Sequence, residues 1–143
     1  MFNPSRDQVR QFFIDTWAKH KAKQVLTPLE DIALNWIEQH PEYHEVLGQS
    51  ESMTREFNVE EGKTNPFLHL SMHLSISEQC SIDQPRGIRQ AVELISHKKQ
   101  SLHEAHHATM ECLGRMIFES QRAGKMPDGN VYIECVQRHA TQD

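Results

Sequence analysis

Apolar residues recur along most of the chain with the spacing of amphipathic α-helices. Near the N-terminus, Val9, Phe13 and Trp17 fall on one face of a helix whose other face is polar. Proline stands where it is favoured, as the first residue of a helix, in Asn3-Pro4, Thr27-Pro28, His40-Pro41 and Asn65-Pro66. These patterns predict helices at about 4–23, 28–39, 41–48, 66–80, 86–98, 101–123 and 130–140.

The predicted fold is therefore all-α, a compact single-domain helical bundle of about six to seven helices spanning residues 1–143. The stretch at about 49–64 is rich in serine, glutamate and glycine, and we expect it to be an irregular surface loop. The chain shows no internal repeat and no linker between domains.

One segment has a pattern that also fits a strand. From Leu68 to Ile76 the apolar residues alternate strictly. The run is long, however, opens with Asn-Pro and is built from leucine and methionine, so we interpret 66–80 as a helix. The difference matters because His69 and His73 lie one turn apart in a helix but ~13 Å apart in a strand.

Composition and charge narrow the class of protein. With 143 residues, of which 37% are hydrophobic, the chain is long enough for one core. The excess of acidic over basic residues, 20 against 15, argues against a partner that is duplex nucleic acid. We find neither a membrane span nor the apolar run of a signal peptide, and therefore expect a cytoplasmic protein. The composition is compatible with a protein partner or with a homo-oligomer.

The three cysteines point to no particular site. Cys80, Cys112 and Cys135 are odd in number, widely spaced and without a CxxC pair, so neither a disulfide framework nor a zinc ribbon is predicted. We expect them to be small buried hydrophobic residues in a reducing compartment.

Histidine is unusually frequent, with ten residues. Three pairs are four residues apart, namely His40/His44, His69/His73 and His103/His107, whereas random placement gives fewer than one such pair. On a helix, residues i and i+4 lie on one face, so that two imidazoles can reach one ion. Two facing helices with one pair each would supply a four-nitrogen metal site.

The stretch from His103 to His107 reads H-E-x-x-H, which in metalloproteases places two zinc ligands and a general-base glutamate on one helix. Those helices usually lie beneath a sheet, and no strand is predicted here. Glu104 also completes a capping box with Ser101, and this structural role explains it equally well. Glu111 lies two turns beyond His103 on the same stripe and is the simplest additional ligand.

We therefore predict one transition-metal site, with zinc or iron as the expected ion and with Glu104 as the candidate catalytic base. The predicted ligands are His69, His73, His103 and His107, and the additional candidates are Glu111, His44 and His40. We expect His20, His97 and His139 to be solvated surface residues.

Three functions fit these residues. The first is a metal-binding helical bundle that could support hydrolytic or redox chemistry. The second is a non-enzymatic helical adaptor with structural histidines, and the third is a small metallopeptidase acting through HEAHH. The sequence does not decide whether the protein is an enzyme.

The chain also resembles a bacterial, mainly proteobacterial, family of small uncharacterised proteins with a domain of unknown function. The resemblance rests on NPFLHLSMHL and HEAxH, and on further stretches at 1–6, 26–30, 40–44, 81–85, 87–89 and 110–114. It implies no activity. In that family's pattern His103 and His107 match and the position of His106 varies, which argues against His106 as a ligand.

Overall fold

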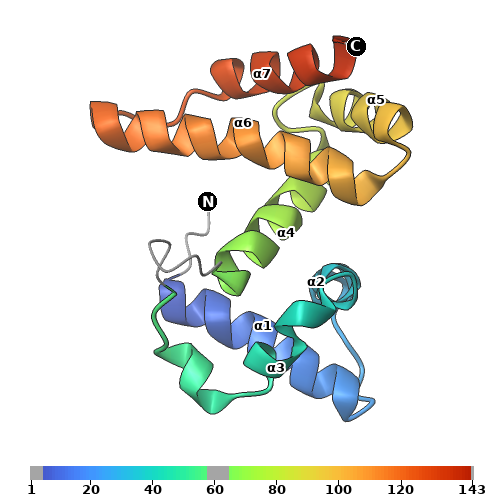
Figure 1. Ribbon diagram of the computed structural model, residues 1–143, viewed down its shortest axis with the longest axis vertical. Helices are drawn as coiled ribbons and strands as arrows, with labels where there is room; N and C mark the ends of the chain where they lie inside the picture. The colour runs from blue at the N-terminus through green and yellow to red at the C-terminus, as the bar shows by residue number, and fades with distance from the viewer. Residues whose placement is uncertain (1–4, 58–64, 143) are drawn as a thin grey trace. The chain divides into compact units, whose positions relative to one another are not determined.

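The computed structural model describes residues 5–57 and 65–142, and these ranges contain seven α-helices and no strand. The predicted all-α fold is thereby confirmed (Figure 1). The helices are α1 (Arg6–Lys21), α2 (Pro28–Glu38), α3 (His44–Leu47), α4 (Pro66–Ile82), α5 (Ile88–Lys99), α6 (Leu102–Ala123) and α7 (Gly129–Thr141). None of the described helices is both long and apolar enough to span a membrane.

The chain divides into two compact units, residues 1–74 and 75–143, with the boundary inside α4. In the first unit, α1, α2, α3 and the start of α4 enclose one hydrophobic cluster. Its buried members are Phe13, Ala33, Trp36, Ile37, Tyr43, Leu47, Phe67 and Leu70. The organisation of the whole chain as a single domain stays a prediction.

Local hydrogen bonds explain where the first helices begin. Thr27 and Glu30 form the predicted capping box at the start of α2. At the start of α1, Ser5 caps the helix and forms a second capping box with Gln8. The predicted cap and first residue at Asn3-Pro4 lie outside the described residues.

The segment with alternating apolar residues is the helix α4, as expected. Asn65 starts it, because its Oδ1 accepts hydrogen bonds from the backbone N–H groups of Phe67 and Leu68. Leu70 and Ile76 are fully buried, whereas Leu68 is 60% exposed. The alternation therefore places apolar residues on more than one face of the helix.

Two predicted segments differ in detail from the structure. The expected helix at 41–48 is a 3₁₀ turn, η1 (Pro41–Tyr43), followed by the short α3. The expected loop at 49–64 contains another 3₁₀ turn, η2 (Ser50–Met53), and its part at 58–64 lies outside the described residues. η2 is ordered because the buried Arg10 donates hydrogen bonds from Nη1 to the carbonyls of Ser52 and Arg55, both at 2.8 Å.

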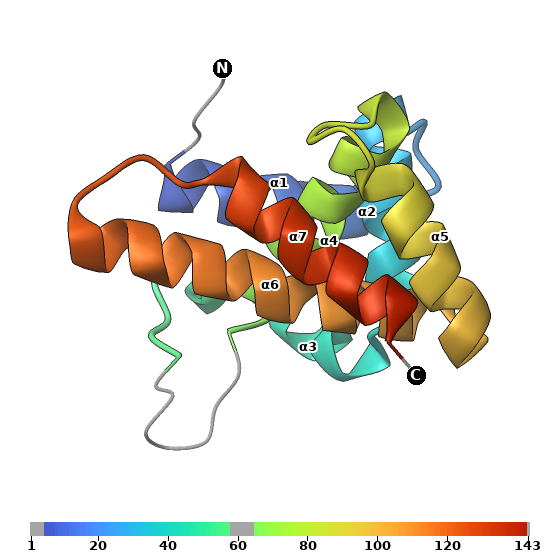
Figure 2. The same cartoon turned by 90° about the horizontal axis from the view of Figure 1, so that it is seen from above.

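In the second unit, α5, α6 and α7 pack against one another, and α7 runs back along α6 (Figures 1 and 2). Cys112 of α6 and Cys135 of α7 form a disulfide, so the prediction that they are free buried thiols is wrong for this pair. The reason is that the antiparallel helices bring together two cysteines that are 23 residues apart in sequence. Cys80 is a free cysteine, and burial raises the pKa of its thiol to about 11.

Candidate metal centre

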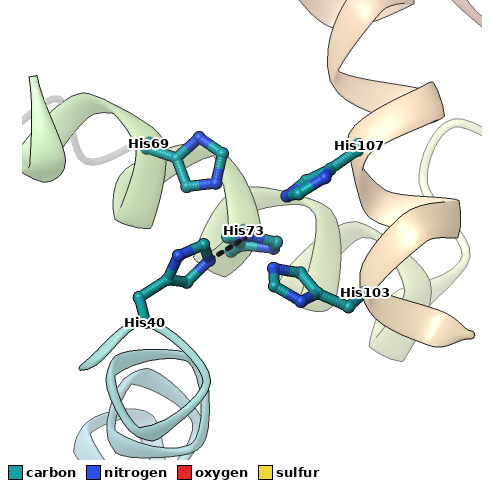
Figure 3. A group of neighbouring side chains, drawn as sticks. All are labelled: His40, His69, His73, His103 and His107. Atoms are coloured by element: carbon teal, nitrogen blue, oxygen red, sulfur yellow. Dashed lines mark hydrogen bonds between the residues drawn. The ribbon is translucent and has the colours of Figure 1, made fainter. Parts of the chain in front are cut away.

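Three histidines come together in the first unit (Figure 3). His69 and His73 lie one turn apart on α4, with ring centroids 4.8 Å apart. His40, between α2 and η1, joins them, and one nitrogen from each of the three rings lies within 4.8 Å of the others. These three imidazoles could therefore hold a metal ion.

A hydrogen bond joins His40 and His73, whose Nε2 atoms are 3.1 Å apart. On its other side, Nδ1 of His40 lies 3.2 Å from a carboxylate oxygen of Glu42. An ionised carboxylate only accepts hydrogen bonds, so Nδ1 carries the proton in this contact. In the neutral ring, the lone pair of Nε2 then points toward His73.

Stacked aromatic rings fix the orientation of both imidazoles. Trp36 stacks on His73 with the centroids 4.1 Å apart and the planes at 13°, and Tyr43 stacks on His40 at 4.9 Å and 10°. His73 is fully buried and His40 is 4% exposed. The two rings have little freedom to turn, so the site is held in place by its surroundings.

The charge distribution near His40 also favours a cationic occupant. Partial burial raises the pKa of Glu42. Hydrogen bonds from its own backbone and from His40 lower the pKa by a larger amount, so the net shift is downward. The carboxylate therefore stays ionised beside the imidazole group. Burial, and then the charge of Glu42, raise the pKa of Tyr43, so its phenol stays neutral.

The second unit carries the other predicted pair. His103 and His107 lie one turn apart on α6, with ring centroids 4.4 Å apart at 61°, and both are half-buried. One nitrogen from each ring lies within 4.8 Å of the other (Figure 3). Ser101 caps the helix by accepting a hydrogen bond from the N–H of Glu104. The carboxylate of Glu104 is exposed and lies 3.6 Å from Nδ1 of His107.

His106, the remaining histidine of HEAHH, differs from this pair. It is 2% exposed, and burial lowers its pKa to about 3, with smaller contributions from His103 and His107. Its imidazole is therefore neutral near pH 7. The metallopeptidase interpretation also requires a sheet beside this helix, and residues 5–57 and 65–142 contain no strand.

The other candidate residues have different surroundings. Nε2 of His44 lies 2.8 Å from the carbonyl of Ile37, and the His44 ring packs against Trp17. These contacts already occupy the imidazole of His44. The carboxylate of Glu111 is 73% exposed and lies 3.9 Å from His139. His97 is exposed as expected, whereas His20 and His139 are half-buried.

A second group of metal-ligating atoms was not predicted. The sulfurs of Cys112 and Cys135 and a ring nitrogen of His139 lie within 4.8 Å of one another. The spacing of Cys135 and His139, i and i+4 on one helix, is the signal in the sequence that could have indicated it. The contribution of Cys112 comes from another helix and has no signal in the sequence.

A family model described as "Domain of unknown function (DUF1841)" matches residues 5–138. Comparison with the curated proteins gives no match. Comparison with the solved structures gives no match either.

Proposed function

Because the chain belongs to the family described as Domain of unknown function (DUF1841), which names no activity, we propose its function from the chemistry of its histidines. The proposed function is the binding of one transition-metal ion. The ligands we propose are His40, His69 and His73 of the first unit, to which the sequence adds His103 and His107 as further candidate ligands.

The contact between His40 and His73 carries this proposal. Two nitrogens bound to one ion at 2.0–2.1 Å lie about 2.9 Å apart at a right angle and about 3.3 Å apart at the tetrahedral angle. The observed distance between the Nε2 atoms, 3.1 Å, falls between these values. The two nitrogens are hydrogen-bonded in the structure, and at this spacing they could also be neighbouring ligands of one ion once the shared proton is lost.

Glu42 supports the same proposal from the other side of His40. Histidines that bind metals commonly donate their second ring N–H to a carboxylate, which fixes the tautomer and makes the ligating nitrogen more basic. The contact between Nδ1 of His40 and Glu42 is of this kind. Glu42 is a positioning residue here and not itself a ligand.

His103 and His107 are the natural source of further ligands, because they offer two more imidazoles one helical turn apart. A shell made of imidazoles suits zinc, iron, copper or nickel, and we propose zinc or iron as the occupant. If one position of the shell is held by water, the bound ion would make that water more acidic and supply a nucleophile for hydrolysis. Glu104 would then be the candidate base.

The test is a metal titration of protein purified without an affinity tag and with its disulfide intact. We expect about one equivalent of zinc or iron(II) per chain, and a loss of affinity on the order of tenfold or more in His69→Ala. His69 is half-buried, so its replacement should leave the fold intact. Uptake far below one equivalent, or unchanged affinity in His69→Ala, would overturn the proposal.

A matched pair of variants separates ligation from general effects. We expect Glu42→Gln to weaken metal binding by roughly tenfold to a hundredfold. The reason is that a neutral amide accepts a weaker hydrogen bond from Nδ1 of His40 than an ionised carboxylate does. His44→Ala should bind as tightly as the wild type, since its ring nitrogen lies against the carbonyl of Ile37. The adaptor alternative predicts no metal binding in any of these proteins.

A further inference from the structure

The packing of α6 against α7 creates a group of ligating atoms that the proposed histidine site does not use. Cys112 lies on α6, and Cys135 and His139 lie one turn apart on α7. The two Cα atoms of the disulfide are 5.7 Å apart, and the two sulfurs and a nitrogen of His139 lie within 4.8 Å of one another. Two thiolates and an imidazole at this separation can bind one ion.

The surroundings of this group combine a buried centre with an open side. Cys112 is 1% and Cys135 is 6% exposed, whereas the side chain of His139 is 38% exposed. The carboxylate of Glu111, next to Cys112 in sequence, lies 3.9 Å from Nε2 of His139 and offers a fourth ligand at the surface. An ion could therefore enter from the side of His139 and reach the two sulfurs.

We propose that Cys112, Cys135 and His139 form a redox-controlled binding site for a divalent zinc-like cation. In the disulfide form the sulfurs are bonded to each other and the site does not bind metal. A thiol reductant breaks the S–S bond, and two electrons and two protons convert the cysteines to thiols while the reductant becomes a disulfide. Metal binding then releases the two thiol protons to solvent and leaves two metal-bound thiolates.

The ligand types determine which ion fits. Thiolates select soft or borderline ions, and a set of two sulfurs, one imidazole and one carboxylate or water is typical of tetrahedral zinc. A disulfide oxidant would reverse the process, because re-forming the S–S bond removes both thiolates and releases the ion. The state of this cysteine pair would thus control whether the second unit holds a metal.

The two helices have enough other contacts to stay together when the disulfide is reduced. Leu113, Tyr132 and Val136, which surround the cysteines in sequence, are all buried. Nζ of Lys98 on α5 donates a hydrogen bond to the carbonyl of His139 at 2.9 Å, which ties the end of α7 to α5. Reduction should therefore free the sulfurs without separating α6 from α7.

Cobalt(II) titration of the full chain tests this inference, because cobalt bound to thiolate gives a charge-transfer absorption that imidazole ligands do not produce. We expect the reduced protein to bind one more equivalent of cobalt than the disulfide form, with this absorption present only after reduction. Zinc added afterwards should displace the cobalt and abolish the band. These readouts do not depend on binding at His40, His69 and His73, so either proposal can fail alone.

Variants complete the test. Cys135→Ser should lose the charge-transfer band, and His139→Gln, at a half-exposed position, should bind cobalt at least tenfold more weakly while keeping its helical circular dichroism. His97→Gln, at an exposed position on α5, is the control and should behave as wild type. A reduced protein without the thiolate band overturns the inference. So does a reduced protein that loses its helical signal, because the disulfide would then be a structural crosslink.

Discussion

At the scale of single residues, Glu30 shows how one buried carboxylate supports the start of a helix. One of its oxygens accepts a hydrogen bond from the N–H of Thr27, and the other lies 2.9 Å from Nζ of Lys19. The backbone bond from Thr27, followed by the bond from Lys19, lowers the pKa of Glu30 below its ordinary value of 4.5. The ionised form is therefore favoured by folding.

The lowered pKa of Glu30 predicts a pH-dependent effect of its replacement. Its contribution is fully present above pH 4.5 and is lost as the pH falls through the lower pKa of the folded state. We expect Glu30→Gln to lower the free energy of unfolding at pH 7 by about 1 kcal/mol, with the difference from wild type narrowing below pH 4.5.

Urea unfolding at pH 7 and at a series of acidic pH values measures this difference. Glu38→Gln, on the exposed face of the same helix, serves as the control and should change the stability little at any pH. A difference between Glu30→Gln and wild type that stays constant from neutral to acidic pH would contradict the assignment of the effect to the ionised carboxylate.

At the scale of elements, the helix α4 depends on the cap that starts it. Asn65 accepts hydrogen bonds from the N–H groups of Phe67 and Leu68 at 3.0 and 3.2 Å. His69 and His73 can act together only while this part of the chain is helical. The cap therefore connects a local hydrogen bond to the geometry of the candidate metal centre.

Replacing Asn65 should destabilise the protein unless the new side chain can still accept the two backbone hydrogen bonds. We expect Asn65→Ala to destabilise the protein by about 1 kcal/mol, because two backbone donors lose their acceptor. Asn65→Asp keeps the acceptor and should remain within a few tenths of a kcal/mol of wild type. Thermal unfolding of both variants measures these changes in stability. An equal loss of stability in the two variants would show that the helix cap does not cause it.

The turn η2 is attached to α1 by the buried Arg10, which also lies over the ring of Phe67 at 5.0 Å. We expect Arg10→Lys to cost about 2 kcal/mol, since a lysine keeps the charge but cannot reproduce the planar donor group that meets the two carbonyls. Arg6→Lys, one turn earlier and exposed, is the control in the same unfolding measurement. Equal stability of the two variants would refute the role of Arg10.

At the scale of the whole molecule, the proposed site predicts how many ions the chain binds. The sequence predicts a single site with His69, His73, His103 and His107 as ligands, so calorimetry on the disulfide form should give one ion per chain. The double variant His103→Ala/His107→Ala should then bind at least tenfold more weakly. Two ions per wild-type chain, or unchanged affinity in the double variant, would show that the two groups bind separately.

Metal should also stabilise the protein, by an amount that grows with the logarithm of the ratio of the free metal concentration to the Kd. At a free metal concentration of one hundred times the Kd, mass action adds about 2.7 kcal/mol to the free energy of unfolding. A chelator should remove this increment in the wild type and have little effect on His69→Ala. Thermal unfolding with and without chelator measures it, and an identical response of the two proteins would contradict specific binding.

The helices were largely predictable because their signals are local. The 3.6-residue period, the capping box of Thr27 and the i,i+4 spacing of His69 and His73 all involve residues a few positions apart. The alternating run in α4 was the hard case, and helix-forming residues behind an Asn-Pro start decided it correctly. The short helix expected at 41–48 was less well predicted, because a segment of this length has little intrinsic preference and takes its form from its neighbours.

The sequence by itself therefore determined the helical class of the fold and the two histidine pairs that can each face one ion. Only the tertiary structure decided that His40, 33 residues away from His73, joins the group and that Cys112 pairs with Cys135. The physical reason is that contacts between distant residues depend on how helices pack and on which loops close between them. No period or cap within one helix encodes that choice.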